Sequence, residues 1–343
     1  MAQVLIIRLS AIGDVAMTIP VIYSAAKARP QDSFTVLTQA FLIPVFMNRP
    51  PNVEMLGINT LGAEKSLRGL LRFSRALVRY DYDIILDLHD VLRTRILRTL
   101  FRLRGKRVYV IDKARKERAR LTARNNKLLT PLRLMTDRYA DVYRAAGLDF
   151  DGSFRSLFED RPPALQVMES VTGKKKGKWI GIAPFAKHRG KIFPTGKMEE
   201  VIAALSEKEE ATLFLFGGRG EEEAVMARWE AKYQRVRSVT GRYSLDNELA
   251  LISSLDLLVS MDSANMHFAS LVGTRVVSIW GATHPYSGFY GYGQRPEDAV
   301  QVELPCRPCS IYGNTTCYRG DWACMTQLTP GMILAKIEEA LGI

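Results

Sequence analysis

The sequence predicts an α/β protein built from two doubly wound domains that face each other across a cleft. Short apolar runs alternate with amphipathic stretches along the chain, which is typical of βα units and parallel sheets. The alternation breaks at 149–163, where Gly152, Pro162 and Pro163 indicate a linker. The 343 residues are long for one core and fit two domains of ordinary size. We therefore place the N-terminal domain at 1–155 and the C-terminal domain at 156–343.

The apolar runs locate the individual elements. In the first half they predict strands at 4–9, 33–37, 53–58, 83–88 and 107–110, with helices that include 67–79 and 136–146. In the second half they predict strands at 179–183, 211–216, 236–239, 257–260 and 275–279, an irregular loop at 281–294 and a closing helix at 331–341. Since no apolar run approaches the roughly 20 residues of a membrane span and no signal peptide is recognisable, we expect a cytoplasmic protein.

The first predicted strand leads directly to a candidate catalytic acid. It runs into a Ser-Ala-Ile-Gly turn that ends at Gly13, and Asp14 begins an apolar-periodic helix. In an open α/β sheet, ligands bind beyond the carboxyl ends of the strands. Asp14 is therefore our candidate general base, and the alternative is that its carboxylate only caps the helix.

The strand at 257–260 ends in a second candidate site. Asp262, Ser263 and Ala264 follow it, a helix comes next, and the following strand leads to Thr283. Ser263 is a good N-cap, and the free N–H groups of a first helical turn suit a diphosphate. An ordinary capped βαβ unit explains the same pattern. His267 lies on the helix side expected to face the strand end, and we interpret it as an organiser of the loop and not as a catalyst.

Basic residues after the strand at 179–183 suit a leaving diphosphate. Lys187, Arg189 and Lys191 lie there, and a diphosphate that departs without a metal needs fixed positive charge. We choose Lys191, which Phe193 and Pro194 anchor. The alternative is a solvated loop lysine.

The turn after the strand at 211–216 is rich in glycine and glutamate. Gly217, Gly218 and Gly220 would let a nucleotide approach the backbone, and Glu221 or Glu222 could accept hydrogen bonds from ribose hydroxyls. The spacing is not the full G-x-G-x-x-G, so this motif is weak alone.

The positive charge is concentrated in one segment. Residues 93–133 hold fifteen Lys or Arg against Asp112 and Glu117, a net +13, while the whole chain carries +12, so the remainder carries −1. An anionic partner is implied. With only Phe101 and Tyr109 available for base stacking, we favour a phosphorylated glycolipid or an anionic lipid surface over nucleic acid. We assign acceptor binding to four residues of this segment: Arg115, Lys116, Arg118 and Arg120. The alternative is a solvated helix face.

All the cysteines lie in one loop, at Cys306, Cys309, Cys317 and Cys324. The C-x-x-C pair has the spacing of a zinc site, but the following gaps are looser than usual. Structural zinc, free thiols and a labile disulfide are the alternatives.

Five motifs in order, SAIGDV, GKIFP, GGRGEEE, DSANMHFAS and WGATHP, resemble those of the heptosyltransferase family, glycosyltransferase family 9, from Val4 to about Pro330. The resemblance implies a GT-B fold and transfer of heptose from ADP-heptose to the inner core of lipopolysaccharide, with inversion and without a catalytic metal. It implies that Asp14 is the general base, that Lys191 contacts phosphate, and that the donor site is in the C-terminal domain. The nucleotide-sugar residues we assign are Gly13, Gly217, Glu221, Glu222, Asp262, Ser263, Ala264, His267 and Thr283.

The sequence departs from the family pattern at Ala264, where glycine is common, and at Phe193, where tryptophan is common. These departures leave open which sugar is transferred. The hypothesis is therefore an ADP-sugar glycosyltransferase with no required cofactor, placed at the inner membrane face by its anionic glycolipid acceptor, with no nucleic acid expected. Transfer of another sugar, nucleic-acid binding and an inert nucleotide-binding scaffold are the alternatives.

Overall fold

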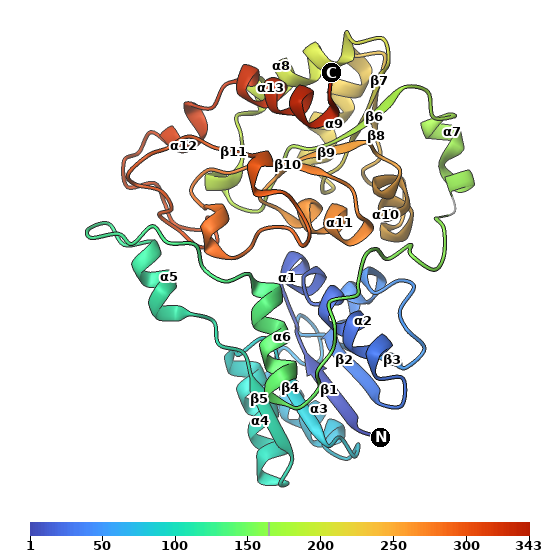
Figure 1. Cartoon of the computed structure of the whole chain (residues 1–343), viewed down its shortest axis with the longest axis vertical. Helices are drawn as coiled ribbons and strands as arrows, with labels where there is room; N and C mark the ends of the chain where they lie inside the picture. The colour runs from blue at the N-terminus through green and yellow to red at the C-terminus, as the bar shows by residue number, and fades with distance from the viewer. Residues whose placement is uncertain (164) are drawn as a thin grey trace. The chain divides into compact units, whose positions relative to one another are not determined.

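The structure is a computed structural model that describes residues 1–163 and 165–343. The chain divides into two compact units. Unit 1 comprises Met1–Lys113 and Leu134–Leu157, and unit 2 comprises Ala114–Arg133 and Phe158–Ile343. Each unit holds one parallel sheet with helices on both faces, as Figure 1 shows. The predicted fold class, two doubly wound α/β domains, is confirmed.

The sheet of unit 1 has five strands, in the order β3-β2-β1-β4-β5. They are β1 (Gln3–Ile7), β2 (Ser33–Gln39), β3 (Val53–Ile58), β4 (Ile84–Asp87) and β5 (Arg107–Val110). All neighbouring pairs are parallel. Four consecutive residues of β1, from Val4 to Ile7, are fully buried, because helices cover the sheet on both faces.

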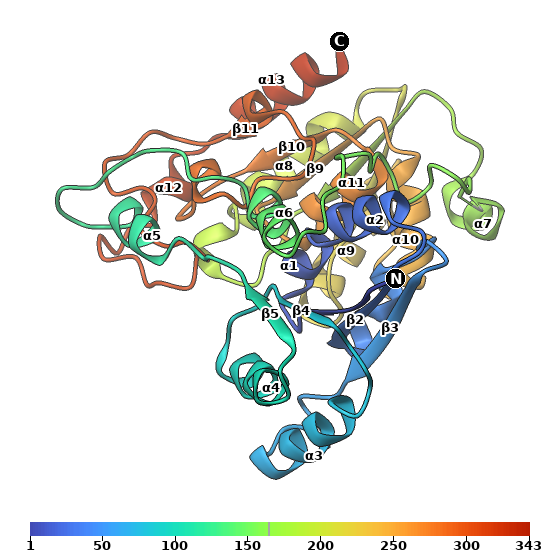
Figure 2. The ribbon, with the colours of Figure 1, turned by 60° about the horizontal axis from the view of Figure 1, so that its bottom comes forward.

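The helices of unit 1 are α1 (Ile12–Ala16), α2 (Ile19–Ala28), the 3-10 helix η1 (Ala40–Val45), α3 (Leu67–Leu77), α4 (Leu92–Leu103) and α6 (Met135–Ala145). Helices α3 and α4 lie on one face of the sheet, and α2 and α6 lie on the other (Figure 2). The sequence predicted one helix beginning at Asp14, but two are present. Pro20 has no N–H for the carbonyl of Ala16 and its ring crowds that carbonyl, so a single helix could not continue.

Unit 2 has six strands in the order β11-β10-β9-β6-β7-β8. They are β6 (Lys178–Ala183), β7 (Ala211–Leu215), β8 (Val236–Ser238), β9 (Leu257–Met261), β10 (Val276–Ile279) and β11 (Ala299–Val300). The first five match predicted strands. The sixth, β11, has two residues, which is too short to produce a recognisable apolar run.

The helices of unit 2 are α5 (Arg115–Leu121), η2 (Leu165–Met168), α7 (Glu169–Thr172), η3 (Arg189–Lys191), α8 (Thr195–Ser206), α9 (Glu221–Lys232), α10 (Leu245–Ser253), α11 (Ala264–Val272), η4 (Pro285–Ser287), η5 (Pro296–Asp298), α12 (Ala323–Thr326) and α13 (Pro330–Leu341). Met198 of α8, Trp229 of α9 and Ile333 of α13 pack in one core with the sheet. Helices α10 and α11 lie against the opposite face (Figure 1). In the described part of the chain, no helix is both long and apolar enough to cross a bilayer.

The unit boundary at 157/158 lies two residues from the expected boundary at 155/156. The segment 114–133, which we expected in the N-terminal domain, belongs instead to unit 2. Arg118 donates a 2.9 Å hydrogen bond to the Tyr312 hydroxyl, and Lys127 Nζ donates to the carbonyls of Cys306 and Pro308, each at 2.8 Å. Position along the chain alone does not reveal such long-range partners.

Each sheet has a topological switch point, where the strand order reverses between neighbouring strands. In unit 1 it lies between β1 and β4, and in unit 2 between β6 and β9. In doubly wound sheets the carboxyl ends of the two strands at this point form the crevice in which ligands bind. We therefore expect the residues that bind ligands to lie near these two switch points.

Candidate active site

Asp14 lies at the switch point of unit 1, immediately beyond β1. It is the third residue of α1, and its side chain is 18% exposed. Oδ1 pairs with the Arg8 guanidinium at 2.7 Å, and Oδ2 accepts a hydrogen bond from the Ala11 N–H at 3.3 Å. A carboxylate offers about four acceptor positions, so this arrangement fixes the side chain and leaves it able to accept a proton from a hydroxyl.

Arg8 connects this aspartate to the neighbouring strand. Its side chain is buried, it donates a 2.8 Å hydrogen bond to the Leu88 carbonyl just after β4, and its guanidinium lies 5.9 Å from the centre of the Tyr139 ring. The Tyr139 hydroxyl in turn donates to the Asp14 carbonyl at 3.5 Å. Arg8 thus links Asp14, the end of β4 and α6.

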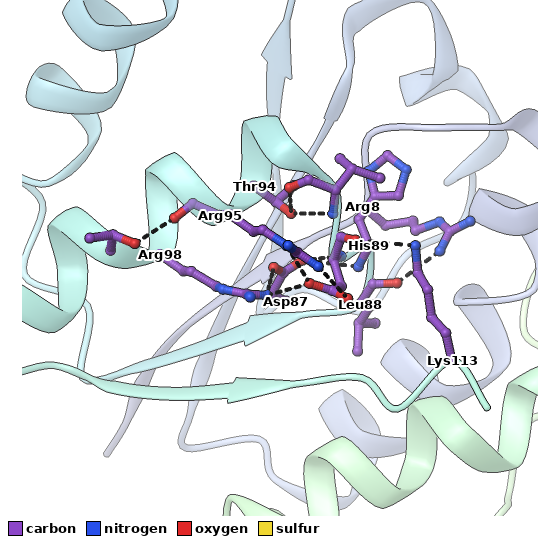
Figure 3. Close-up of polar contacts among 11 residues, drawn as sticks. Arg8, Asp87, Leu88, His89, Thr94, Arg95, Arg98 and Lys113 are labelled. Atoms are coloured by element: carbon purple, nitrogen blue, oxygen red, sulfur yellow. Dashed lines mark hydrogen bonds and ion pairs between the residues drawn. The ribbon is translucent and has the colours of Figure 1, made fainter. Parts of the chain in front are cut away.

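A cluster of charged residues occupies the end of β4 (Figure 3). Asp87 is fully buried and accepts hydrogen bonds from the N–H groups of His89 and Asp90 at 3.0 and 2.8 Å. Arg98 pairs with both aspartates, and Arg95 pairs with Asp90. The pairing compensates the buried carboxylates and shapes the turn beyond β4.

His89 lies within this turn, where its Nδ1 accepts a 3.4 Å hydrogen bond from the Leu9 N–H. Burial, followed by the nearby Arg8 and Lys113 charges, lowers the pKa of His89 to about 3. The imidazole is therefore neutral near pH 7 and can act as this acceptor. The hydrogen bond from Leu9 to His89 is thus a second contact between the loops that follow β1 and β4, after the one from Arg8 to Leu88.

The switch point of unit 2 brings three predicted residues together. Lys191 Nζ lies 2.9 Å from Asp262 Oδ2, and the Thr283 hydroxyl donates to the same oxygen at 2.7 Å. These residues follow β6, β9 and β10 respectively. Gly313 has φ +76°, and a Cβ there would lie 2.7 Å from Lys191 Cγ, so glycine leaves room for the lysine side chain. An ammonium has three donors, and two remain for a ligand beyond Asp262.

Helix α11 begins beside this group. Ser263 is its N-cap in extended conformation, but its side chain makes no capping hydrogen bond and lies 3.3 Å from the Ser260 hydroxyl instead. The N-terminal N–H groups of α11, beginning at Ala264, suit an anion. His267 is buried in the same helix, which fits the interpretation of a structural residue.

The turn after β7 is held by its own glutamates. Glu222 Oε2 accepts a 2.6 Å hydrogen bond from the Gly218 N–H, while Glu221 is exposed. A Cβ at Gly217 would lie 2.7 Å from Met226 Cε, so a larger residue there would displace the flexible end of that side chain. Since β7 is next to β6, this turn lies at the same edge of the sheet as Lys191.

The four predicted acceptor residues lie on α5 and differ in exposure. Arg115, Lys116 and Arg120 are exposed. Arg118 is buried, with its guanidinium 4.9 Å from the centre of the Phe289 ring. Arg118 therefore fastens α5 to the rest of unit 2, and the other three side chains are exposed at the surface.

All four cysteines line one cavity together with Arg307 and Trp322. They are free thiols, and burial raises the pKa of Cys309 and raises that of Cys324 to about 11. Metal ligation needs thiolates at bonding distance. Among the described residues, no group of three or more His, Cys, Asp or Glu side chains is placed to hold a metal ion. The zinc alternative is therefore not supported, and free thiols describe this loop.

Three arginine and histidine residues that hold these loops in place were not predicted from the sequence. Arg8 and His89 connect two strand ends, and Arg307 is buried and donates to the carbonyls of Trp280, Gly281 and Thr283. A basic residue in or beside an otherwise apolar segment could have indicated them from the sequence. Arg8, directly after Val4–Ile7, is such a residue. Since buried arginine needs several acceptors, such a residue marks a site of loop organisation.

Two doubly wound sheets, with a carboxylate at one switch point and a lysine beside a helix N-terminus at the other, have the architecture of GT-B glycosyltransferases. The family model of glycosyltransferase family 9 (heptosyltransferase) matches residues 70–317, more than half of the chain. The chain belongs to this family.

Characterised relatives agree with this assignment. The chain is 24% identical over 278 residues to lipopolysaccharide heptosyltransferase 3 of Escherichia coli, covering 79% of this chain and 81% of the relative. It is 22% identical over 369 residues to lipopolysaccharide heptosyltransferase 1 of Pseudomonas aeruginosa, covering 99% and 98%.

Solved structures share the fold at low identity. Escherichia coli heptosyltransferase WaaC with ADP-2-deoxy-2-fluoro heptose superposes with a TM-score of 0.69 at 19% identity, covering 98% of this chain and 99% of that one. A family 9 glycosyltransferase from Veillonella parvula gives a TM-score of 0.75 at 18% identity, covering 99% and 97%.

Proposed function

We propose that this protein transfers a heptose from ADP-heptose to the inner core of lipopolysaccharide, with inversion and without a catalytic metal. Family membership and relatives named as lipopolysaccharide heptosyltransferases support the sugar and the acceptor. The similar WaaC structures with ADP and an ADP-heptose analogue support the donor. The observation that carries the proposal is the Lys191–Asp262–Thr283 group beside the N-terminus of α11, at the switch point of the unit 2 sheet.

The proposed reaction is a single displacement. Asp14 accepts the proton of an acceptor hydroxyl as that oxygen forms a bond with the anomeric carbon of the donor. The bond between this carbon and the diphosphate oxygen breaks on the opposite side, so the configuration inverts and ADP leaves. General-base assistance of this kind is typically worth about 10² to 10⁴ in rate.

Fixed positive charge would take the place of a metal at the leaving group. The two remaining Lys191 donors and the N–H groups at Ser263 and Ala264 would stabilise the negative charge that develops on the diphosphate. Asp262 and Thr283 would hold the lysine in place. Glu221 or Glu222 would contact the ribose, although Glu222 must then share its carboxylate with Gly218.

The acceptor is an anionic glycolipid in this proposal, and the protein acts from the cytoplasm at the inner membrane face. The exposed cations Arg115, Lys116 and Arg120 of α5 would contact its phosphates and acidic sugars. Arg118 would support this surface from beneath. The apparent KM for the acceptor should therefore rise with salt, because ionic screening weakens such contacts.

Replacing the proposed base tests the mechanism. Asp14→Asn keeps the size of the side chain but cannot accept the proton, so turnover should fall by about 10² to 10⁴. The shift of melting temperature caused by ADP should persist. Asp149→Asn, a change at an exposed acid of the same unit, is the control and should leave both measurements unchanged. A near-normal rate for Asp14→Asn would show that the base is elsewhere.

A second candidate is transfer of a different sugar, because Ala264 and Phe193 depart from the usual family residues. A panel of ADP-, UDP- and GDP-linked sugars, assayed with and without EDTA, separates the two and tests metal independence. Mass spectrometry of lipopolysaccharide from a deletion strain would identify the missing sugar. Tight retention of RNA in a filter assay, without any effect of ADP on melting, would instead support the nucleic-acid alternative.

A further inference from the structure

Helix α3 of unit 1 carries a row of arginines on its outer face. Arg68, Arg72, Arg75 and Arg79 are spaced by four, three and four residues, which places them on one side of the helix and of the turn that ends it. All four are exposed, whereas Leu70, Ser74 and Leu77 on the opposite side are buried. We call these four residues the arginine stripe.

Nothing within this segment compensates the charge of the stripe. From Lys65 to Tyr80 the sequence contains no Asp or Glu. Across residues 1–163 and 165–343, no ion pair of the four stripe arginines is seen. Like charges three and four residues apart on a helix repel one another. The stripe therefore opposes formation of its own helix, and an external anion beside it would relieve this repulsion.

Three other basic residues of unit 1 have carboxylate partners, unlike the stripe. On α4, Arg95 pairs with Asp90, and Arg98 pairs with the same carboxylate at 2.9 Å. Lys106 pairs with Asp81 at 2.6 Å. The stripe also lies outside the segment 93–133 that dominates the sequence charge. In space the stripe adjoins that segment, because α3 packs against α4 and Arg104 donates a 2.9 Å hydrogen bond to the Val78 carbonyl beside Arg79.

Exposed apolar side chains lie at both ends of the stripe. Leu67, the first residue of α3, is 62% exposed, and Leu61 in the preceding loop is 78% exposed. Tyr80, just after Arg79, is 61% exposed. Basic helices with exposed leucine lie in the plane of anionic membrane surfaces, and tyrosine is favoured at the headgroup level. A surface for single-stranded nucleic acid would need more exposed rings for stacking.

We propose that the arginine stripe docks this protein on an anionic lipid bilayer. The guanidinium groups contact headgroup phosphates, and Leu61 and Leu67 enter the boundary between headgroups and acyl chains. The inference goes beyond the proposed function, because it uses neither Asp14 nor Lys191 and needs no donor sugar. It supplies a membrane contact independent of the acceptor.

Vesicle flotation tests this surface directly. The protein is mixed with vesicles of phosphatidylglycerol and phosphatidylcholine in equal parts, or of phosphatidylcholine alone. We expect binding to the anionic vesicles only, and its loss at about 1 M salt, where the Debye length is about 3 Å. Each arginine near an anionic surface contributes about fivefold to binding. The fourfold Arg→Gln variant of the stripe should therefore bind at least about a hundredfold more weakly.

Matched variants separate charge from folding. The fourfold Arg→Lys variant of the stripe keeps the charge and should still float. A control with the same charge change on unit 2, made of Arg161→Gln, Lys174→Gln, Lys176→Gln and Arg228→Gln, should bind like the unmodified protein. Leu61→Ser with Leu67→Ser should weaken binding without changing its salt dependence. Sugar transfer to a soluble, delipidated acceptor should be unchanged in the stripe variant.

Three results would overturn the proposal. The first is equal flotation of the stripe variant and the unmodified protein. The second is an equal loss in the unit 2 control, which would show that only total charge matters. The third is stripe-dependent binding of an oligonucleotide in the absence of vesicle binding, which would assign the surface to nucleic acid. Since flotation needs no turnover, failure of this proposal leaves the proposed transferase reaction untouched, and the reverse also holds.

Discussion

The charged partner Arg8 positions Asp14. The Arg8 guanidinium contacts both Oδ1 of Asp14 and the Leu88 carbonyl just after β4. The position of the proposed base therefore depends on where β4 ends. A base must lie within hydrogen-bond reach of the proton it removes. Arg8 is therefore a positioning residue in the proposed reaction.

Arg8→Gln should lower kcat by about 10²-fold, because a displacement of about 1 Å at a reacting group costs that much. The shift in melting temperature with ADP should not change. Arg8→Lys should recover part of the rate, which a purely structural role would not predict. Arg29→Gln, which removes a comparable 2.6 Å ion pair with Asp32 in the same unit, is the control. An unchanged kcat in Arg8→Gln would remove Arg8 from the mechanism.

Lys191 is the corresponding residue of unit 2. Lys191→Met keeps much of the side-chain volume but removes the charge, leaving Asp262 with only the Thr283 hydroxyl of its two partners in this group. Turnover should fall by about 10² to 10³, as for loss of one donor to a developing negative charge. Lys187→Met, at an exposed lysine of the same loop, should have little effect. Equal losses in both variants would indicate a general electrostatic effect.

At the level of elements, the strands were predictable and several helices and loops were not. Val4–Ile7 and Leu257–Val259 are continuous, buried apolar runs, which a strand buried on both faces explains. The seven residues of α5 give no apolar period, because five of them are charged and only Arg118 and Leu121 are buried. Its place in unit 2 depends on contacts with residues far along the chain.

For the candidate site, the individual residues were predictable from the sequence, but their contacts with one another were not. Strand ends identified Asp14, Lys191, Asp262 and Thr283, because parallel strands bring their carboxyl ends to one edge. Sequence could not show that Lys191 pairs with Asp262, since this requires β6 and β9 to be neighbours. Strand order depends on packing of the whole sheet, and not on any local pattern.

Helix α3 is the element in which local stability and the proposed docking conflict. Three like-charged neighbour pairs lie along the stripe, and each costs about 0.2–0.5 kcal/mol. The fourfold Arg→Gln variant should therefore raise the free energy of unfolding by about 1 kcal/mol at low salt, with the gain lost at high salt. Urea unfolding of this variant and of the unit 2 control at both salt concentrations measures the effect. A loss of stability would show that the arginines have favourable contacts within the protein.

At the scale of the whole molecule, the two units place their candidate residues by the same rule. Each sheet reverses its strand order once next to its first strand, β1 in unit 1 and β6 in unit 2. Asp14, the proposed base, retains 18% exposure, and Lys191, which we propose to contact phosphate, retains 16%. In each unit the proposed reacting group is therefore partly exposed, while its ion-pair partner, Arg8 or Asp262, is 6% exposed and holds it from within.

Buried titratable groups in both units should give the whole molecule a maximum of stability near neutral pH. Burial lowers the pKa of His89 to about 3 and that of His284 to about 4, each helped by nearby cations. Both are neutral when folded, so stability is lost as the pH falls below the usual histidine value of about 6.5. Burial raises the pKa of Glu248 to about 7. The folded state favours the protonated form of Glu248. The contribution of this residue to the stability of the protein is therefore fully present below about pH 4.5 and is lost as the pH rises through about 7.

Glu248→Gln isolates the alkaline side of this profile, because the amide has nearly the same shape and does not titrate. The variant should match the original protein at about pH 5 and be more stable at about pH 8, by an amount of the order of 2 kcal/mol. Unfolding in urea at both pH values measures the difference. Glu221→Gln, at an exposed glutamate, is the control and should show no such dependence. If Glu248→Gln is less stable at about pH 8, the carboxylate has a favourable partner in the folded protein, and burial is not its dominant interaction.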